Sequence, residues 1–231
     1  MDIFDVPRTD LPIVGSDKRF PVHRVYCLGR NFADHVRELG GEPERTPPVF
    51  FLKTTDCIVP GGGDIEYPPR TDNLHHEIEL VVALGKGGSN LSPDAALECV
   101  YGYGVGIDLT RRDHQQAAKE HGGPWDTAKS FEQAAPMTAI VPVAATGHPD
   151  SGRIWLSVND TVRQDADLAD MIWPVPDALA ELSTLYTLQS GDLLFAGTPA
   201  GVGPLLPGDR VESGIDGVGE LSIVMRDGHR Q

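Results

Sequence analysis

Three acidic residues on two strand-like segments have the chemistry and spacing of a divalent-cation site. Glu77 and Glu79 lie two residues apart in the run 75–84, whose second half is aliphatic and ends at Gly85. Because side chains alternate faces along a strand, these carboxylates point the same way, with Cα atoms about 6.5–7 Å apart. Two carboxylates on one face of a buried strand are unfavourable unless positive charge lies between them. The alternative is an exposed strand edge on which both glutamates are solvated.

Asp108 favours the metal-site interpretation. It lies at the far end of a second strand-like run, 101–109, which is rich enough in glycine to let another chain segment approach closely. Three carboxylates form an all-oxygen ligand set, which suits Mg²⁺ or Mn²⁺ better than zinc. Mg²⁺ is octahedral, so three protein oxygens leave positions for water and for a chelating substrate.

A histidine and a glutamate, His35 and Glu38, form a second candidate group. Residues spaced i, i+3 are neighbours on one helix face. The surrounding sequence predicts such a helix, with Asn31 as its N-cap, Leu39 as its last residue and Gly40 as its stop. The pair is compatible with an ordinary surface contact. It is equally compatible with a dyad in which the carboxylate fixes the histidine tautomer and raises its basicity.

Six short motifs follow one another along the chain. They are Gly-Arg-Asn-Phe-Ala-Asp-His at 29–35, Phe-Leu-Lys at 51–53, His-His-Glu-Ile-Glu-Leu at 75–80, the run 108–115, Ala-Lys-Ser-Phe at 128–131 and Gly-Thr-Pro-Ala-Gly-Val-Gly at 197–203. In residue type and in order, these motifs resemble those of the fumarylacetoacetate hydrolase family, specifically its small single-domain acylpyruvase branch. Phe32 stands where that family usually has tyrosine. This chain therefore lacks the tyrosine hydroxyl and any substrate contact that the hydroxyl would make.

The resemblance implies a fold, an assembly and a set of site residues. The fold is α+β, a strand-dominated mixed β-sandwich roll like the C-terminal domain of that family, and the assembly is a homodimer. The implied metal ligands are Glu77, Glu79 and Asp108. The implied catalytic residues are His35 and Glu38, which would activate water, and Lys129, which could stabilise an enolate oxygen. The implied substrate-binding residues are Arg30, Lys53, Arg112, Gln115 and Thr198.

The activity implied by the resemblance is hydrolysis of a carbon–carbon bond in an acylpyruvate. The expected reaction converts fumarylpyruvate to fumarate and pyruvate, in aromatic catabolism, with Mg²⁺ or Mn²⁺ as cofactor. One alternative within the family is oxaloacetate decarboxylation, which uses the same metal-held enolate. Another is a metal-stabilised binding domain without turnover, against which the presence of both His35 and Glu38 argues.

Charge and composition limit the partners. The formal net charge of −15 argues against nucleic acid or an anionic membrane. A small anionic 2-keto acid would need local cations in its pocket; the candidates are Arg30, Lys53, Arg112 and Lys129. On spacing alone, Arg112 and Gln115 also fit a solvated helix face. The segment 123–130 differs from a P-loop only at Ala128, but it follows a polar helical segment and not a buried strand, so nucleotide binding is not expected.

The remaining sequence predicts one catalytic domain over 22–231, preceded by a loosely packed lead-in at 1–21. A helix is expected from Arg111 to about His121, capped by Thr110. The dipeptide 159–160 predicts a tight hairpin turn between two strands. Three cysteines without CxxC spacing, no apolar run of about 18–20 residues and no signal-peptide pattern predict a cytoplasmic protein with reduced thiols.

Overall fold

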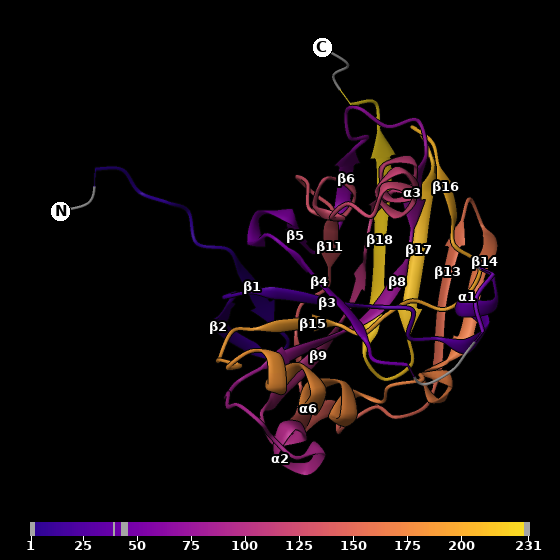
Figure 1. The fold of residues 1–231 in the computed structure, drawn as a ribbon. Coiled ribbons are helices and arrows are strands. Elements are labelled where there is room, and N and C mark those ends of the chain that lie inside the picture. The colour runs from indigo at the N-terminus through magenta and orange to yellow at the C-terminus, as the bar shows by residue number, and fades with distance from the viewer. Residues whose placement is uncertain (1–2, 39, 43–45, 229–231) are drawn as a thin grey trace.

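Two packed β-sheets form the body of the molecule in the computed structural model, which describes residues 3–38, 40–42 and 46–228 (Figure 1). The larger sheet has the order β4-β3-β15-β8-β9-β11-β5, with β12 paired to β9. Its strands are β3 (Val25–Gly29), β4 (Val49–Lys53), β5 (Ile58–Pro60), β8 (Ile78–Leu84), β9 (Val100–Ile107), β11 (Ala135–Met137), β12 (Val141–Pro142) and β15 (Leu193–Phe195).

The second sheet has the order β14-β13-β17-β18-β6. Its strands are β6 (Gly63–Glu66), β13 (Arg153–Val158), β14 (Thr161–Asp167), β17 (Arg210–Ile215) and β18 (Gly219–Arg226). Three short strands, β10 (Thr110–Arg111), β7 (Leu74–His76) and β16 (Gly203–Leu205), form a third sheet in that order. The hairpin predicted at 159–160 joins β13 to β14, and Asn159 and Asp160 both have the positive φ angles, 50° and 62°, of a tight turn.

Helices cover the ends and edges of the sheets. They are α1 (Ala33–Glu38), α2 (Pro93–Leu97), α3 (Arg112–His121), α4 (Asp126–Lys129), α5 (Val143–Thr146) and α6 (Val175–Leu185), with 3₁₀ turns η1 (Thr55–Cys57) and η2 (Leu168–Asp170). α2 packs against α6 at one end of the molecule, and α3 contacts α4 near the other end (Figure 1). Among the described residues, none of the helices has the length and apolarity needed to cross a lipid bilayer.

The core lies between the central strand pair of the larger sheet and the second sheet. All seven residues of β8 are buried, and β9 pairs with it along its length. β13 contacts β8, while β17 and β18 contact β9. Most strand pairs are antiparallel, but β15–β3, β11–β5 and β18–β6 are parallel. The predicted strand-dominated mixed sandwich is therefore confirmed.

Glycines in β9 allow the close packing expected of this strand. A Cβ at Gly102 would lie 2.3 Å from the Val141 carbonyl oxygen. A Cβ at Gly106 would lie 2.6 Å from the Phe195 ring and 2.7 Å from Val81. Because these neighbours leave no space for a side chain, glycine keeps β9 straight and buried directly before Asp108.

The lead-in differs from the prediction over part of its length. Residues 10–21 form a hairpin of β1 (Asp10–Ile13) and β2 (Ser16–Pro21), in which Leu11, Ile13 and Phe20 are buried in the core. The prediction of loose packing is therefore wrong for this hairpin. Its strands are short, and apolar and polar residues alternate only weakly along them. The predicted end of the first helix, Leu39, lies outside the described residues.

Candidate active site

The three predicted metal ligands converge at the end of the central strand pair. Glu79 lies in β8, Glu77 occupies the break between β7 and β8, and Asp108 follows β9 directly. The backbone N–H of Asp108 donates to the Glu77 carbonyl over 2.8 Å, which aligns the two strand ends. One carboxylate oxygen from each acid lies within 4.8 Å of the other two, and all three side chains are buried. The solvated-edge alternative is therefore wrong.

Buried ammonium groups lie directly beside these acids. Lys129 Nζ donates to Glu77 Oε2 over 2.7 Å and to Asp108 Oδ2 over 2.6 Å. Burial alone would lower the pKa of Lys129, but Asp108 and Glu77 raise it above its ordinary value. Burial would likewise raise the pKa of Glu77, and Lys129 and Arg112 outweigh this effect and lower it. Both side chains therefore stay charged.

Glu79 has less compensation. Its Oε2 accepts one hydrogen bond, from the Gly197 backbone N–H over 2.8 Å. Burial, then the neighbouring Asp108 and Glu77 carboxylates, raise the pKa of Glu79 well above its usual range. A divalent cation among the three carboxylates would supply the missing positive charge. The donor set therefore fits a divalent metal site, with the hard oxygen ligands that suit Mg²⁺ or Mn²⁺.

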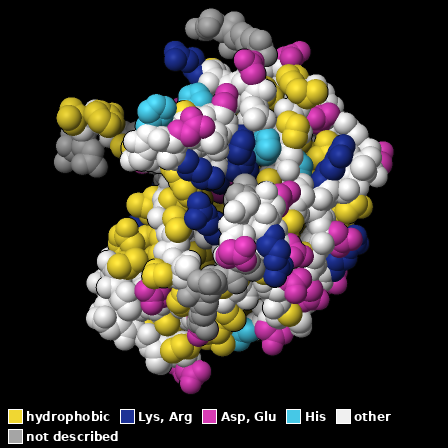
Figure 2. Space-filling view, turned by 45° about the vertical axis from the view of Figure 1, so that its right-hand side comes forward, with side chains coloured by type: hydrophobic (Ala, Val, Ile, Leu, Met, Phe, Trp, Pro, Cys, Tyr) yellow, Lys and Arg dark blue, Asp and Glu magenta, His cyan; other side chains and the backbone are white. Residues whose placement is uncertain are grey.

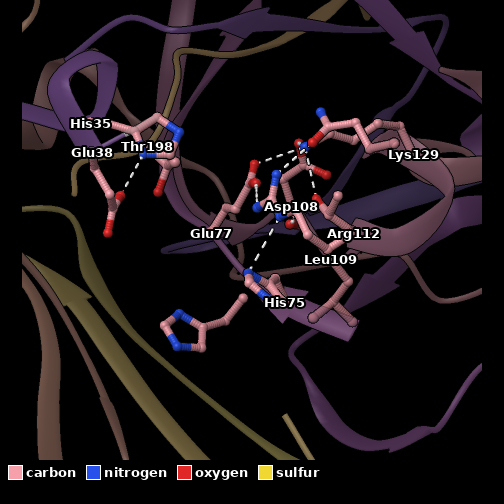
Figure 3. A network of polar contacts seen from close by, with 12 residues as sticks. His35, Glu38, His75, Glu77, Asp108, Leu109, Arg112, Lys129 and Thr198 are labelled. Atoms are coloured by element: carbon pink, nitrogen blue, oxygen red, sulfur yellow. Dashed lines mark hydrogen bonds and ion pairs between the residues drawn. The ribbon is translucent and has the colours of Figure 1, made fainter. Parts of the chain in front are cut away.

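The candidate dyad forms on α1. His35 Nδ1 lies 2.9 Å from Glu38 Oε2, and His35 is only 5% exposed. Because an ionised carboxylate only accepts, Nδ1 carries the proton, and Nε2 keeps a lone pair. Glu38 Oε1 also accepts from the Gly201 backbone N–H over 3.0 Å, which ties α1 to the loop after β15. Figure 3 shows the dyad on the opposite side of the site from Lys129.

Asn31 does not cap α1 as predicted. Its side-chain amide donates to the carbonyl oxygens of Trp173 and Ala196 over 3.0 and 2.7 Å. Its Oδ1 accepts from the Trp173 N–H over 2.8 Å. The Phe32 carbonyl instead accepts the bond from Val36 that begins the helix. Asn31 is fully buried because it fastens the segment before α1 to two distant parts of the chain.

Arg112 lies beside the acids and is held on three sides. Its guanidinium donates to Glu77 and Gln115, and its Nε donates to His75 Nδ1 over 3.3 Å (Figure 3). His75 Nε2 donates to Asn73 Oδ1 over 2.9 Å. The neutral ring therefore accepts one hydrogen bond at Nδ1 and donates one at Nε2. Burial, followed by the Arg112 charge, lowers the pKa of His75 to about 4. We did not predict this role of His75, although it lies in the motif at 75–80.

Two further predictions need correction. Thr110 lies in β10 and does not cap α3; its hydroxyl accepts from Lys129 Nζ over 2.7 Å. Lys53 is not brought to the substrate cavity. Its ammonium is buried behind Asp108, 2.8 Å from Oδ1, and also donates to the carbonyl oxygens of Leu109 and Lys129. It holds the acid in place because β4 delivers it to the back of the site.

Gln164 supports the cavity from the second sheet. Its Oε1 accepts from the Ile78 N–H and lies 3.0 Å from His76 Nδ1, and its Nε2 donates to Thr198 Oγ1 over 2.8 Å. Gln164 thus connects the strand of the acids to the predicted substrate contact Thr198. No local sequence signal marks it, because its partners come from distant segments.

One cavity brings together most of the predicted residues. It is lined by Leu28, Gly29, Arg30, His35, Phe51, Glu77, Glu79, Arg112, Gln115, Lys119, Trp125, Lys129 and Thr198. Its volume of about 30 Å³ holds one or two water molecules. The sequence analysis missed Phe51, Lys119 and Trp125. Lys119 follows Gln115 by four residues, so helix periodicity could have placed it on the same face.

Comparison with known proteins identifies the family of this chain. The model of the fumarylacetoacetate hydrolase C-terminal domain matches residues 24–225. The chain belongs to the fumarylacetoacetate hydrolase family. A fumarylpyruvate hydrolase from a Ralstonia species is 42% identical over 76% of this chain and 91% of its own length. A mitochondrial oxaloacetate tautomerase from Mus musculus is 42% identical over 84% of this chain and 87% of its own length.

A solved structure of the family has the same fold over its full length. The fumarylpyruvate hydrolase from Pseudomonas aeruginosa, in complex with Mn²⁺ and pyruvate, superposes with a TM-score of 0.96 and 44% identity. The match covers 98% of this chain and 100% of the other. The rolled sandwich expected from the resemblance is therefore confirmed.

Proposed function

We propose that this chain hydrolyses fumarylpyruvate to fumarate and pyruvate with a divalent metal cofactor. The observation that carries the proposal is one cavity lined by His35, Glu77 and Glu79, in which Glu38 holds the histidine and Asp108 completes the group of converging carboxylates. A small 2-keto acid fits this arrangement, because its adjacent carboxylate and carbonyl oxygens can chelate a cation. The relatives that hydrolyse fumarylpyruvate support the same substrate.

In this reaction His35 Nε2 takes a proton from water as the water oxygen bonds to the acyl carbonyl carbon. Glu38 holds the ring and stabilises the imidazolium through Nδ1. The bond to the methylene carbon then breaks, its electron pair leaves as the enolate of pyruvate, and a proton adds to that carbon. A divalent cation held by Glu77, Glu79 and Asp108 would supply Lewis-acid stabilisation of negative charge on the substrate. Lys129, already beside Glu77 and Asp108, adds positive charge on the same side.

We assign the other residues by their positions. Arg112 and Gln115 would bind the carboxylate of the pyruvoyl end, and Thr198 would contact the same end from the opposite loop. Arg30 would contact substrate near the opening, because it lines the cavity and is exposed. Lys53 would act only by holding Asp108.

A turnover assay over several acylpyruvates, with and without added Mg²⁺ or Mn²⁺, tests the proposal. We expect hydrolysis of fumarylpyruvate, its loss after chelation with EDTA, and its recovery on addition of either metal. Full activity in the chelated protein would refute the metal-dependent mechanism. Absence of hydrolysis for every acylpyruvate, with metal bound, would refute the function.

Interconversion of the keto and enol forms of oxaloacetate is a second candidate function, favoured by the similarity to the mouse tautomerase. Like the hydrolysis, this reaction needs a bound 2-keto acid, but it requires only proton transfer at carbon. His35 is a suitable base for that transfer. Decarboxylation of oxaloacetate, the alternative from the sequence, stays a prediction. Following enol absorbance and CO₂ release separately from the same oxaloacetate solution distinguishes the two.

We also propose that the protein is a cytoplasmic homodimer acting in aromatic catabolism, and that its catalytic domain comprises the predicted residues 22–231 together with the packed hairpin 10–21. A segment at the N-terminal end supports association, because Ile3, Phe4 and Val6 are 96%, 70% and 77% exposed as it extends away from the body (Figure 1). A second copy would cover these side chains. Light scattering coupled to size-exclusion chromatography should give twice the monomer mass, and a monomer mass would refute the dimer.

A further inference from the structure

The cations that line the cavity fall into two groups. Arg112 and Lys129 are held by the acids at the bottom of the site. Arg30 and Lys119 line the same cavity, but neither forms an ion pair or a side-chain hydrogen bond within the described part of the chain. In a protein of formal net charge −15, two cations that have no counter-ion among the described residues lie beside one cavity and are available to an anionic ligand. Figure 2 shows Lys and Arg side chains gathered near the centre of one face of the molecule.

The burial of these residues indicates which end of the cavity they occupy. Glu77 and Glu79 are 5% and 2% exposed and form the bottom. Lys119 is half-buried, and Arg30 is exposed. A substrate whose pyruvoyl end lies at the acids therefore directs the far end of its acyl chain toward Lys119 and Arg30.

Local charge favours an anion at this end. Burial, followed by the charges of Arg112 and Arg30, lowers the pKa of Lys119, because the ammonium lies among other cations. A carboxylate at this position relieves that repulsion. Arg30 also adopts a positive φ of 60°, which is unfavourable for a residue with a side chain. Such backbone strain is typical of functional positions, and here it occurs at the turn between β3 and α1.

An aromatic wall lies between the two ends of the cavity. The rings of Phe51 and Trp125 have centroids 5.7 Å apart, and the Lys119 ammonium lies 5.5 Å from the Trp125 centroid. Aromatic faces pack well against flat, conjugated groups. A planar unsaturated acyl chain fits this wall better than a branched one.

We propose that Lys119 and Arg30, beside Trp125, form a subsite for a carboxylate at the far end of the acyl chain. The preferred substrates are then dicarboxylic acylpyruvates with a planar unsaturated chain, and monocarboxylic acylpyruvates are poorer. This inference rests on the proposed hydrolysis, and it assigns to Lys119 the selection among acylpyruvates. Lys119 acts on binding and not on the bond-breaking step.

The test compares two substrates in matched variants. Fumarylpyruvate carries the far carboxylate, and acetylpyruvate has a methyl group in place of the whole carboxyvinyl chain. We expect Lys119→Met to lower kcat/KM for fumarylpyruvate by about 10- to 100-fold, the range for loss of a charge-assisted contact, and to change acetylpyruvate less than about twofold. Lys119→Arg should restore most of the loss because it keeps the charge. Lys86→Met, at an exposed position outside the cavity, is the control and should leave both values unchanged.

Calorimetry with fumarate and with crotonate makes the test independent of turnover. Crotonate has the same unsaturated chain with one carboxylate, so wild-type protein should bind fumarate more tightly, and Lys119→Met should remove the difference. Equal losses for both substrates, or an unchanged preference for fumarate in the variant, would overturn the subsite. Failure of the wild type to hydrolyse either substrate would refute the proposed function, and the calorimetry would still decide on the subsite.

Discussion

The two walls of the cavity hold their functional groups in different ways. Glu77 directly precedes β8, Glu79 lies on it, and Asp108 directly follows β9; both strands are almost wholly buried, and the Asp108 side chain is 0% exposed. The dyad lies on α1, a helix of six residues, and the Glu38 side chain is 34% exposed. Isolated helices of this length are unstable in water, so α1 depends on contacts with other segments.

This difference indicates a division of labour. The strand wall is rigid because many backbone hydrogen bonds and a full hydrophobic core fix its side chains. Among the described residues, the helix wall is held by the side-chain bonds of Asn31, by the Glu38–Gly201 bond and by a backbone bond from Ile172 to Asn31. A wall held in this way can move more readily than the strand wall. Metal binding and water activation should therefore be separable by mutation.

The largest effect is expected on the strand wall. Asp108→Asn leaves the buried ammonium group of Lys53 without its counter-charge, and leaves Lys129 paired with Glu77 alone. The free energy of unfolding should fall by about 3–5 kcal/mol, and binding of Mn²⁺ should be lost. Denaturant unfolding and titration calorimetry measure both. Asp160→Asn, at an exposed hairpin position, is the control and should behave as wild type. Wild-type metal affinity in Asp108→Asn would contradict the assignment of the ligand.

His35→Ala tests whether the walls are separable. We expect hydrolysis to fall by about 10²- to 10⁴-fold, the usual effect of removing a general base, with metal affinity unchanged. Oxaloacetate decarboxylation should survive better, because it needs no activated water. The measurement compares the rates of fumarylpyruvate hydrolysis and oxaloacetate decarboxylation at one saturating metal concentration. A parallel loss of both activities would mean that His35 organises α1 and does not activate water.

Glu38→Gln should have a smaller effect than removal of the histidine. The amide oxygen can still accept from Gly201, but the charge that stabilises the imidazolium is lost. Loss of one charge-assisted hydrogen bond corresponds to about 1.5–3 kcal/mol, or about a 10- to 100-fold fall in kcat. KM should change little, since Glu38 does not line the cavity. An effect as large as that of His35→Ala would show that the carboxylate itself takes the proton.

Asn31→Ala should give the smallest effect, confined to the helix wall. It removes three hydrogen bonds to Trp173 and Ala196, and stability should fall by about 1–3 kcal/mol. Hydrogen exchange should increase in α1 and remain unchanged in β8. Equal increases in both elements would mean that the two walls unfold as one unit, contrary to the comparison.

The sequence by itself determined the parts of this protein that depend on local periodicity. Strand alternation placed Glu77 and Glu79 on one side, a buried aliphatic run indicated β8, and helix spacing paired His35 with Glu38. Residues 159–160 predicted a hairpin for the same reason. Motif order also predicted the family, and with it the fold and the metal. Each of these needs only neighbours within a few positions, or a resemblance along the whole chain.

Only the tertiary structure decided where long polar side chains find their partners. Asn31 and Thr110 have the chemistry of helix caps, but bonds to distant groups use their side chains instead. Lys53 lies in a site motif, yet β4 delivers it behind Asp108, outside the cavity. Gln164 connects two sheets without any local signal. A buried polar group must be paired wherever the fold brings a partner, and that position depends on segments far away in the sequence.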